Sequence, residues 1–390
     1  MSIITTIFLV MRALLLALLW PSVGLVIASQ WPDGLLRTFS MIELGMVALA
    51  LTGAGVAVSF AQWRVFTAFI LVLTIWSGLR FAGTPAAMVG LPILALVLLP
   101  WLRERGITGT GPALAGCIIV LVVALWARGG APASSADSLL FHPLEILTTE
   151  ISLAALITLL GLSGALVRLA IRREAIDIGL AGALASSIPL VLAPSSLTPG
   201  ALAVTAAAVL SLWSGLLLHA WRLAYLDELT GLPNRRALEE RIQRLPRQWA
   251  VAMLDIDHFK KFNDRWGHDV GDQVLRRVAA VLARAGAGGQ AYRYGGEEFS
   301  VIFPHADSER AADAIERLRL GVSRDPFQVR GDRAGAKRRG HGGGRDTQRI
   351  TLSAGLTIAN GEPPESVFDK ADKALYRAKA AGRNRLIQAE

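Results

Sequence analysis

The chain has 390 residues, of which 53% are hydrophobic and 18% charged, and its formal net charge is +9. Residues 1–222 hold 11 Arg, no Lys and 8 Asp+Glu, whereas residues 223–390 hold the other 29 Lys+Arg and 23 Asp+Glu. This contrast excludes a single soluble globule, a disordered chain and a disulfide-rich secreted domain, because one half has the composition of a lipid-dissolved segment and the other that of a soluble domain.

The apolar half predicts membrane-spanning helices, which need about 20 mostly apolar residues each. Arg, Pro and Gly divide it into stretches at 8–28, 41–61, 65–82, 86–102, 112–128, 149–170, 176–194 and 200–220. We expect an all-α transmembrane bundle of about eight spans, with seven as the alternative. The first stretch carries Pro21, which also allows two half-helices, and we expect it to be retained rather than cleaved as a signal peptide.

The arginines of this half indicate its orientation. With eight spans and both ends in the cytoplasm, eight arginines lie in cytoplasmic segments and three, Arg37, Arg80 and Arg128, lie outside. This distribution obeys the positive-inside rule and places the N-terminus and the soluble half in the cytoplasm.

Ionisable residues of the membrane half lie near the predicted span ends, which favours a sensing or anchoring bundle over a transporter. Among the acidic ones, Glu43, Glu145, Glu150, Glu174 and Asp177 lie near such ends. An outer loop at about 129–148, which contains His142, is an alternative site for ligand sensing. The linker from Trp221 to Leu226 is too short for another domain, so a signal would pass directly from the last helix into the soluble half.

The soluble half alternates helical and strand patterns, which predicts an α+β layer in which helices cover a sheet. The expected strands are 249–256, a hairpin at 291–303 that turns at Gly295 and Gly296, 350–358 and 385–388. The expected helices are 235–245, 258–266, 270–285, 307–323 and 364–381.

Three patterns in this half carry chemistry. The first strand ends with Asp255, and the hairpin turn is followed by Glu297, so these carboxylates converge if strand and hairpin are neighbours. Two close carboxylates repel unless a cation sits between them, and Mg²⁺ with substrate phosphates suits such a place. Lys379 and Arg383, at a helix C-terminus, are suited to bind a polyphosphate. Taken singly, these patterns also fit a solvated strand end, a plain turn and complementation of the helix dipole.

Four motifs occur in order along residues 225–390. They are DELTGLPNRR at 227–236, DIDHFKKFND at 255–264 with GHDVGD at 267–272, YGGEEF at 294–299, and ADKALYRAK at 371–379 with GRN at 382–384. Together they resemble the GGDEF domain of diguanylate cyclases, with GGEEF as a variant of its signature. The resemblance covers about 165 of the 390 residues and does not extend to the membrane half.

The resemblance implies a sheet like that of a polymerase palm or adenylyl cyclase. It also implies condensation of two GTP molecules to cyclic di-GMP and two pyrophosphates. Each domain would hold one GTP, so the active form would be a homodimer. Two Mg²⁺ ions per site, or Mn²⁺ in their place, would be the cofactors.

The resemblance also implies roles for particular residues. Metal ligands would be Asp255, the Ile256 carbonyl, Glu297 and Glu298. Substrate-binding residues would be Asn263 and Asp272 at the guanine edge, Gly295 and Gly296 beside GTP, and Lys379 and Arg383 at the β- and γ-phosphates. Lys260 would assist the phosphates, and Glu297, Glu298 and Lys260 form the catalytic set.

The sequence therefore predicts a membrane region at 1–222 that controls a GGDEF cyclase domain at 223–390, located in the bacterial inner membrane with the lipid bilayer as a partner. The alternatives are a catalytically silent receptor that binds GTP and signals by contact, and a transporter with a regulatory tail. The modest charge excess does not indicate a nucleic-acid partner. No phosphodiesterase motif is present in the sequence, so hydrolysis of the product is not expected.

The chain departs from the family pattern at three places. Residues 286–289 read GAGG where many members carry an inhibitory Arg-x-x-Asp, so we expect no product inhibition through that site. A Gly/Arg-rich insertion at about 330–349 predicts a flexible loop, with contact to lipid head groups or RNA as the alternative. Ala354 precedes Gly355 where the family has a larger residue, and we expect only a change in packing.

Overall fold

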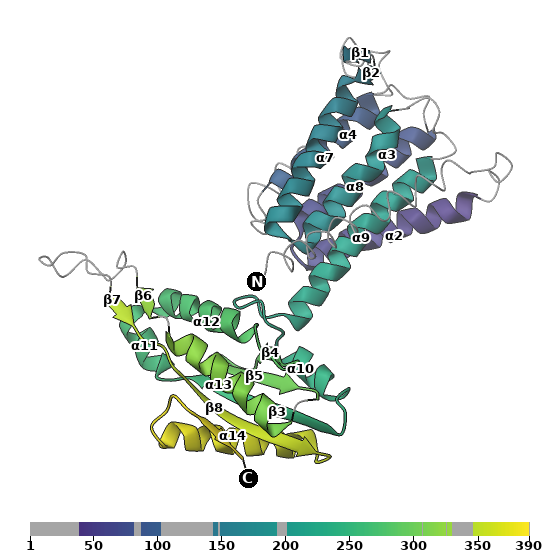
Figure 1. Ribbon diagram of the computed structural model, residues 1–390. Coiled ribbons are helices and arrows are strands. Elements are labelled where there is room, and N and C mark those ends of the chain that lie inside the picture. Colours follow the sequence, from purple (N-terminus) through teal and green to yellow (C-terminus); the bar gives the residue numbers. More distant parts are fainter. Residues whose placement is uncertain are drawn as a thin grey trace, which may run out of the picture. The chain divides into compact units, whose positions relative to one another are not determined.

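The computed structural model describes residues 39–81, 87–102, 143–146, 149–192, 201–305, 307–324, 326–329 and 346–389. The chain divides into two compact units, Met1–Trp221 and Arg222–Glu390. Figure 1 shows the described helices and strands of both units. Each unit has its own buried apolar side chains.

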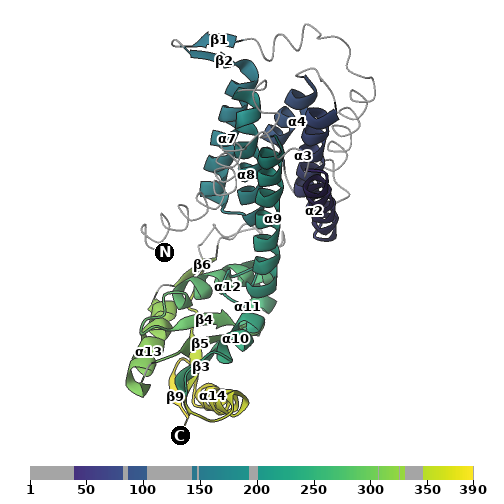
Figure 2. The same cartoon turned by 90° about the vertical axis from the view of Figure 1, so that its right-hand side faces the viewer.

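The N-terminal unit packs helices side by side (Figures 1 and 2). Its described helices are α2 (Phe39–Ser59), α3 (Trp63–Phe81), α4 (Ala87–Leu98) with a 3₁₀ turn at Leu99–Trp101, α7 (Leu153–Arg172), α8 (Ala175–Leu192) and α9 (Ala201–Tyr225). They occupy six of the expected apolar stretches, and the other two, 8–28 and 112–128, lie outside the described residues. Strands β1 (Pro143–Ile146) and β2 (Thr149–Ser152) form a hairpin that the sequence analysis missed, so α7 begins at Leu153 rather than at 149.

Two helices of the described residues are long and apolar enough to cross a membrane, at Ala155–Arg172 and Leu202–Tyr225. Four others are apolar but shorter, at Gly45–Ser59, Trp63–Trp76, Pro92–Trp101 and Ala175–Leu190. The described helices thus support two candidate spans rather than about eight. The turn at Leu99–Trp101, for example, ends α4 without interrupting the hydrophobic pattern of its stretch.

Small residues let the helices of this unit approach closely. A Cβ on Gly215 of α9 would lie 2.8 Å from the backbone nitrogen of Gly179 in α8, so the two helices touch through their main chains. The Trp213 Nε1 of α9 donates to the Leu49 carbonyl oxygen of α2 at 2.9 Å. Close packing and interhelical hydrogen bonds of this kind stabilise helices against one another where water contributes little.

The C-terminal unit is the α+β layer that the sequence predicts. Its five-stranded sheet has the order β4-β5-β3-β8-β9, antiparallel except for the β8–β9 pair. The strands are β3 (Gln248–Ile256), β4 (Gln290–Arg293), β5 (Glu298–Phe303), β8 (Leu352–Asn360) and β9 (Leu386–Gln388). The helices are α10 (Arg235–Ile242), α11 (Phe259–Trp266), α12 (His268–Leu282), α13 (Ser308–Arg324) and α14 (Pro364–Ala380).

Helices cover both faces of the central strand β3, which is buried after its first residue. Ala250, Ala252 and Leu254 pack in one core with side chains of α12 and α13. Trp249, Val251 and Met253 pack in a second core with α10 and α14 on the other face (Figure 2). Side chains alternate across a strand, so a continuous apolar run is required where both faces are covered.

The structure corrects the C-terminal bound of the expected insertion. Asp346–Gln348 forms strand β7, which pairs antiparallel with β6 (Phe327–Val329). The loop expected at about 330–349 therefore ends in a strand, and residues 330–345 lie outside the described part of the chain. Residues 346–348 are polar and show no apolar pattern that would predict a strand. They form one because they pair with β6.

The contact between β8 and α14 predicts the effect of a small substitution. A Cβ on Gly355 would lie 2.2 Å from the Ala371 carbonyl oxygen and 2.2 Å from the Leu375 nitrogen, both of them backbone atoms of α14. We expect Gly355→Ala to lower the free energy of unfolding of this unit by about 1–3 kcal/mol, because overpacking forces helix and sheet apart. Hydrogen–deuterium exchange of the β8 amides in the full chain measures the change. Gly286→Ala is the control, since its Cβ would meet only the Arg317 Nη2 atom, at 3.7 Å; equal protection in the two variants would contradict the prediction.

Candidate active site

The pairing of β3 with β5 brings the acidic residues of two motifs together. Asp255 and Glu298 are direct cross-strand partners, and the Ile256 amide donates to the Glu297 carbonyl oxygen at 3.4 Å. The neighbouring strands on which the predicted convergence depends are therefore present. Asp255 is only 4% exposed, which places its carboxylate inside the edge of the sheet.

The electrostatics of this place favour a cation. Burial raises the pKa of the Asp255 carboxyl, an effect that the nearby Lys379 ammonium opposes. Burial also raises the pKa of Glu297, and the negative charge of Asp255 raises it further. Lys379 Nζ lies 2.8 Å from Asp255 Oδ2. The Lys379 ammonium thus already forms an ion pair with Asp255, at the position where the sequence predicts a metal ion.

The donor set fits Mg²⁺ only in combination with a substrate. No group of three or more His, Cys, Asp or Glu side chains in the described part of the chain is arranged to hold a metal. Asp255, Glu297 and the Ile256 carbonyl offer oxygen donors of the kind that Mg²⁺ prefers. Mg²⁺ is usually bound by one or two carboxylates plus phosphate oxygens, so such a partial set agrees with a nucleotide-dependent site.

The two signature glycines do different things. A Cβ on Gly295 would lie 2.7 Å from Glu298 Oε2, so glycine is needed here to accommodate the neighbouring carboxylate. No atom lies within 4 Å of a Cβ placed on Gly296, which is exposed. The space beside Gly296 is therefore open, whereas Glu298 fills the space beside Gly295.

Arg293, which the sequence analysis did not single out, holds the signature turn. Its guanidinium donates to the carbonyl oxygens of Gly295, at 3.2 Å, and Gly296, at 2.8 Å. The same group bonds both carboxylate oxygens of Asp227, at 2.7 and 2.8 Å. Burial raises the pKa of Asp227, but hydrogen bonds from Thr230 and Arg293 outweigh it and hold that pKa below its usual range.

A second part of the site lies on α11 and α12. Asn263 Oδ1 is buried and has no hydrogen-bond partner in the described part of the chain. A Cβ on Gly271 would lie 1.9 Å from that oxygen, so only glycine at 271 lets the Asn263 amide stay there. The neighbouring Asp272 is half-buried. An orphaned buried acceptor carries a desolvation cost, and it is a place where a ligand N–H group fits.

The loop after α14 carries Arg383 in a left-handed conformation, with φ 61°. Asp257 fixes this loop: its Oδ2 accepts from the Asn384 amide at 3.0 Å and from Thr351 Oγ1 at 2.6 Å, and its Oδ1 accepts from Ser353 Oγ at 2.6 Å. Arg319 of α13 also donates to the Asn384 carbonyl oxygen at 3.0 Å. Asp257 and Arg319 were not expected to contribute, because their partners lie far from them in the sequence.

The structure thus joins most of the predicted residues at one edge of the sheet. Asp255, Ile256, Glu297, Glu298 and Lys379 form the acidic site and its cation. The positive charge of Arg383 opposes in part the rise that burial causes in the pKa of Asp255. Asn263 and Asp272 form the separate position on α11 and α12, and Lys260 is exposed in the first turn of α11.

Comparison with known proteins gives a family match in this unit. Residues 224–385 match the family model described as "Diguanylate cyclase, GGDEF domain". Diguanylate cyclase DgcP of Pseudomonas aeruginosa is 43% identical over 172 residues, which cover 42% of this chain and 24% of DgcP. Response regulator PleD of Caulobacter vibrioides is 39% identical over 179 residues, which cover 43% of this chain and 37% of PleD.

A solved structure of the coiled coil and GGDEF domain of DgcB from Caulobacter crescentus, in complex with c-di-GMP, is 38% identical. It covers 44% of this chain and 90% of that chain, with a TM-score of 0.40. The chain spans about a quarter of the length of DgcP and a little over a third of that of PleD. The family match lies within the C-terminal unit. Residues 224–385 are therefore similar to the GGDEF domain family of diguanylate cyclases.

Proposed function

We propose that the C-terminal unit condenses two GTP molecules to cyclic di-GMP, with release of two pyrophosphates. The convergence of Asp255 and Glu297 beside Lys379 supports this proposal most directly. The relatives named as diguanylate cyclases support it as well. The GGEEF form of the signature supplies the same two carboxylates as GGDEF, with one more methylene on the first.

Phosphoryl transfer depends mostly on positioning and on neutralising charge. Two Mg²⁺ ions, or Mn²⁺, would neutralise phosphate charge and make the 3′-hydroxyl more acidic when bound. Asp255, the Ile256 carbonyl and Glu297 would hold them, with Glu298 beside them. Lys379 and Arg383 would hold the β- and γ-phosphates with help from Lys260.

Asn263 and Asp272 would bind the edge of guanine. That edge presents N–H donors, and the buried Asn263 Oδ1 is an acceptor without a protein partner. The 3′-oxygen of one GTP would attack the α-phosphorus of the other, and the bond to the leaving pyrophosphate would break. Each domain holds one GTP, so the reaction would require two domains facing each other in a homodimer.

The helix α9 supports control of this unit by the N-terminal region. It runs from Ala201 to Tyr225, past the boundary between the two units. Its last turn is tied to the opening motif, because Asn234 Nδ2 donates to the Ala224 carbonyl oxygen at 2.9 Å and the Asn234 amide to that of Tyr225 at 2.9 Å. Arg293 then links Asp227 of that motif to the signature turn. A movement of α9 would reach the glycine turn through these bonds.

We also propose that the N-terminal unit lies in the bacterial inner membrane as a sensory or anchoring region, with its N-terminus and the GGDEF domain in the cytoplasm. The two candidate spans and the shorter apolar helices support this location. The lipid bilayer would then be a partner of the protein.

The metal site provides the main test of the proposed activity. We expect Glu297→Ala to lower the rate of cyclic di-GMP formation from GTP and Mg²⁺ by about 100-fold or more, because it removes preorganised charge at the reacting phosphate. Chromatography of the nucleotides formed by the full-length protein measures the rate. Glu309→Ala, at an exposed position of α13, is the control. If the unmodified protein binds GTP but forms no cyclic di-GMP, the silent-receptor alternative holds instead.

The guanine position provides a separate test. We expect Gly271→Ala to raise the KM for GTP about tenfold, because the new Cβ displaces the Asn263 amide and removes about one hydrogen bond. Alanine is the better helix former, so lost helix stability would not explain the effect. Gly55→Ala is the control, since it is also helical and no atom lies within 4 Å of its Cβ. An unchanged KM in Gly271→Ala would argue against the guanine assignment.

The Arg383 loop provides the third test. We expect Asp257→Asn to lower kcat/KM for GTP about 10- to 100-fold, because the amide cannot accept all of the bonds from Thr351, Ser353 and Asn384, and Arg383 is then misplaced. Steady-state kinetics of the full chain, with Asp313→Asn on α13 as the control, measure the loss. Wild-type kinetics in Asp257→Asn would show that the loop does not position the phosphates.

A further inference from the structure

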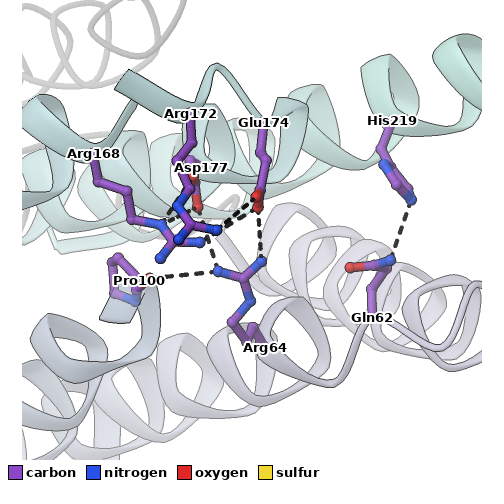
Figure 3. Close-up of polar contacts among 8 residues, drawn as sticks. All are labelled: Gln62, Arg64, Pro100, Arg168, Arg172, Glu174, Asp177 and His219. Atoms are coloured by element: carbon purple, nitrogen blue, oxygen red, sulfur yellow. Dashed lines mark hydrogen bonds and ion pairs between the residues drawn. The ribbon is translucent and has the colours of Figure 1, made fainter. Parts of the chain in front are cut away.

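A pocket of about 550 Å³ lies in the N-terminal unit, where the ends of α3, α4, α7 and α8 meet. Its lining combines three arginines and Glu174 with the apolar side chains of Trp101, Val167 and Ile171. Figure 3 shows Arg64, Arg168 and Arg172 converging on the carboxylates of Glu174 and Asp177. Neither the proposed cyclase chemistry nor the comparisons assign a role to this pocket.

Two arginines of the lining, Arg64 and Arg168, are paired with the buried carboxylate of Asp177. Arg64 is 2% exposed and Asp177 is 1% exposed. Arg64 Nη1 lies 3.4 Å from Asp177 Oδ1, and Arg168 Nε lies 3.0 Å from Asp177 Oδ2. Removing such groups from water is costly unless they are paired, so this network holds the guanidiniums rigidly at the ends of three helices.

Glu174 is the shared carboxylate at the open side. Its Oε2 lies 3.2 Å from Arg64 Nη2 and 3.4 Å from Arg168 Nη2. Arg172 Nη1 reaches Glu174 Oε1 only at 3.8 Å, beyond hydrogen-bond length, and the Arg172 side chain stays 60% exposed. Three guanidiniums thus share the carboxylates of Glu174 and Asp177. Arg172, the most exposed of the three, has the longest ion-pair distance. This arrangement suits one more anionic group at Arg172 and Arg168.

The walls of the pocket are apolar and exposed. Val167 is 57% and Ile171 75% exposed, one turn apart on α7, and Trp101 is 56% exposed. The Trp101 ring lies over Gly164 of the same helix, where a Cβ would be 2.6 Å from its Cζ2 atom. Gly164, Val167 and Ile171 follow helical spacing, so the apolar strip continues along α7 from the arginines. Exposed apolar surface beside clustered charge suits a ligand that has both a charged and an apolar part.

We propose that this pocket binds an anionic amphiphile, with its phosphate or carboxylate headgroup at Arg168 and Arg172 and its acyl chain along Val167, Ile171 and Trp101. Guanidiniums bind phosphate and carboxylate through two parallel hydrogen bonds, and basic pockets between helices bind anionic headgroups. The C-terminal end of the candidate span Ala155–Arg172 brings both parts of such a molecule within reach. A bilayer phospholipid and a free fatty acid share this chemistry. Glu174 occupies the headgroup position in part, and it is the internal competitor of the ligand.

Native mass spectrometry of the full-length protein in detergent tests the proposal. One arm adds phosphatidylglycerol, a second adds phosphatidylcholine of equal chain length, and a third adds sodium dodecanoate. We expect retention of phosphatidylglycerol or dodecanoate over phosphatidylcholine. Retention of phosphatidylglycerol alone identifies a bilayer lipid as the source, and retention of dodecanoate alone a free fatty acid.

The variants separate a ligand site from a purely structural ion network. Arg172→Gln should lower retention of the anionic ligand about fivefold, and Glu174→Gln should raise it by a similar factor, because one removes a headgroup contact and the other the internal competitor. Ile171→Ser, on the exposed apolar wall, should weaken retention without altering the buried charges. Arg244→Gln, which is 70% exposed in the other unit, is the matched control. Equal retention of all three amphiphiles, lower retention in Glu174→Gln, or an equal loss in Arg244→Gln would overturn the proposal.

Discussion

The buried carboxylate of Asp255 constrains most of the C-terminal unit. A charge that is 4% exposed is costly unless it is paired, and Lys379 supplies the partner at 2.8 Å. That pair joins the end of the central strand β3 to the last turn of α14. Gly355 lets α14 lie directly on β8, which in turn is hydrogen-bonded to β3. The close contact of Gly355 with α14 therefore fixes where this helix lies on the sheet, and with it the position of Lys379 beside Asp255.

The bonds around this carboxylate determine how far its neighbours can move. Asp257, two residues further along, ties the Arg383 loop to Thr351 and Ser353. Arg293 ties the signature turn to Asp227, just after α9. Each anchor is a charged group that several hydrogen bonds satisfy, and such bonds are stronger than neutral ones. The Arg383 loop and the signature turn are thus held in place by the protein itself, whereas Asn263 Oδ1 has no hydrogen-bond partner among the described residues.

The N-terminal unit uses buried charge in another way. Arg64, Arg168, Glu174 and Asp177 join the ends of three helices, with Glu174 and Arg172 at the exposed side. In the C-terminal unit the buried charges face a proposed metal and nucleotide. In the N-terminal unit they adjoin an exposed apolar strip on α7, which favours a ligand with a charged end and an apolar chain.

The sequence by itself determined the α+β layer, the order of its helices and strands, and the acidic pair at the end of β3. These follow from period-2 and period-3.6 patterns and from motifs that lie within a few residues of one another. Tertiary structure alone decided which apolar stretches are long helices, that 346–348 forms a strand, and that β1 and β2 form a hairpin. It also decided which distant charges are paired. Arg293 binds Asp227 across 66 residues of sequence, and Asp257 accepts from the Asn384 amide across 127. Asp177 accepts from Arg64 across 113 residues. Local periodicity indicates which face of a helix or strand is buried. It does not indicate which distant charged residue will lie opposite a given side chain, because that depends on how the elements pack.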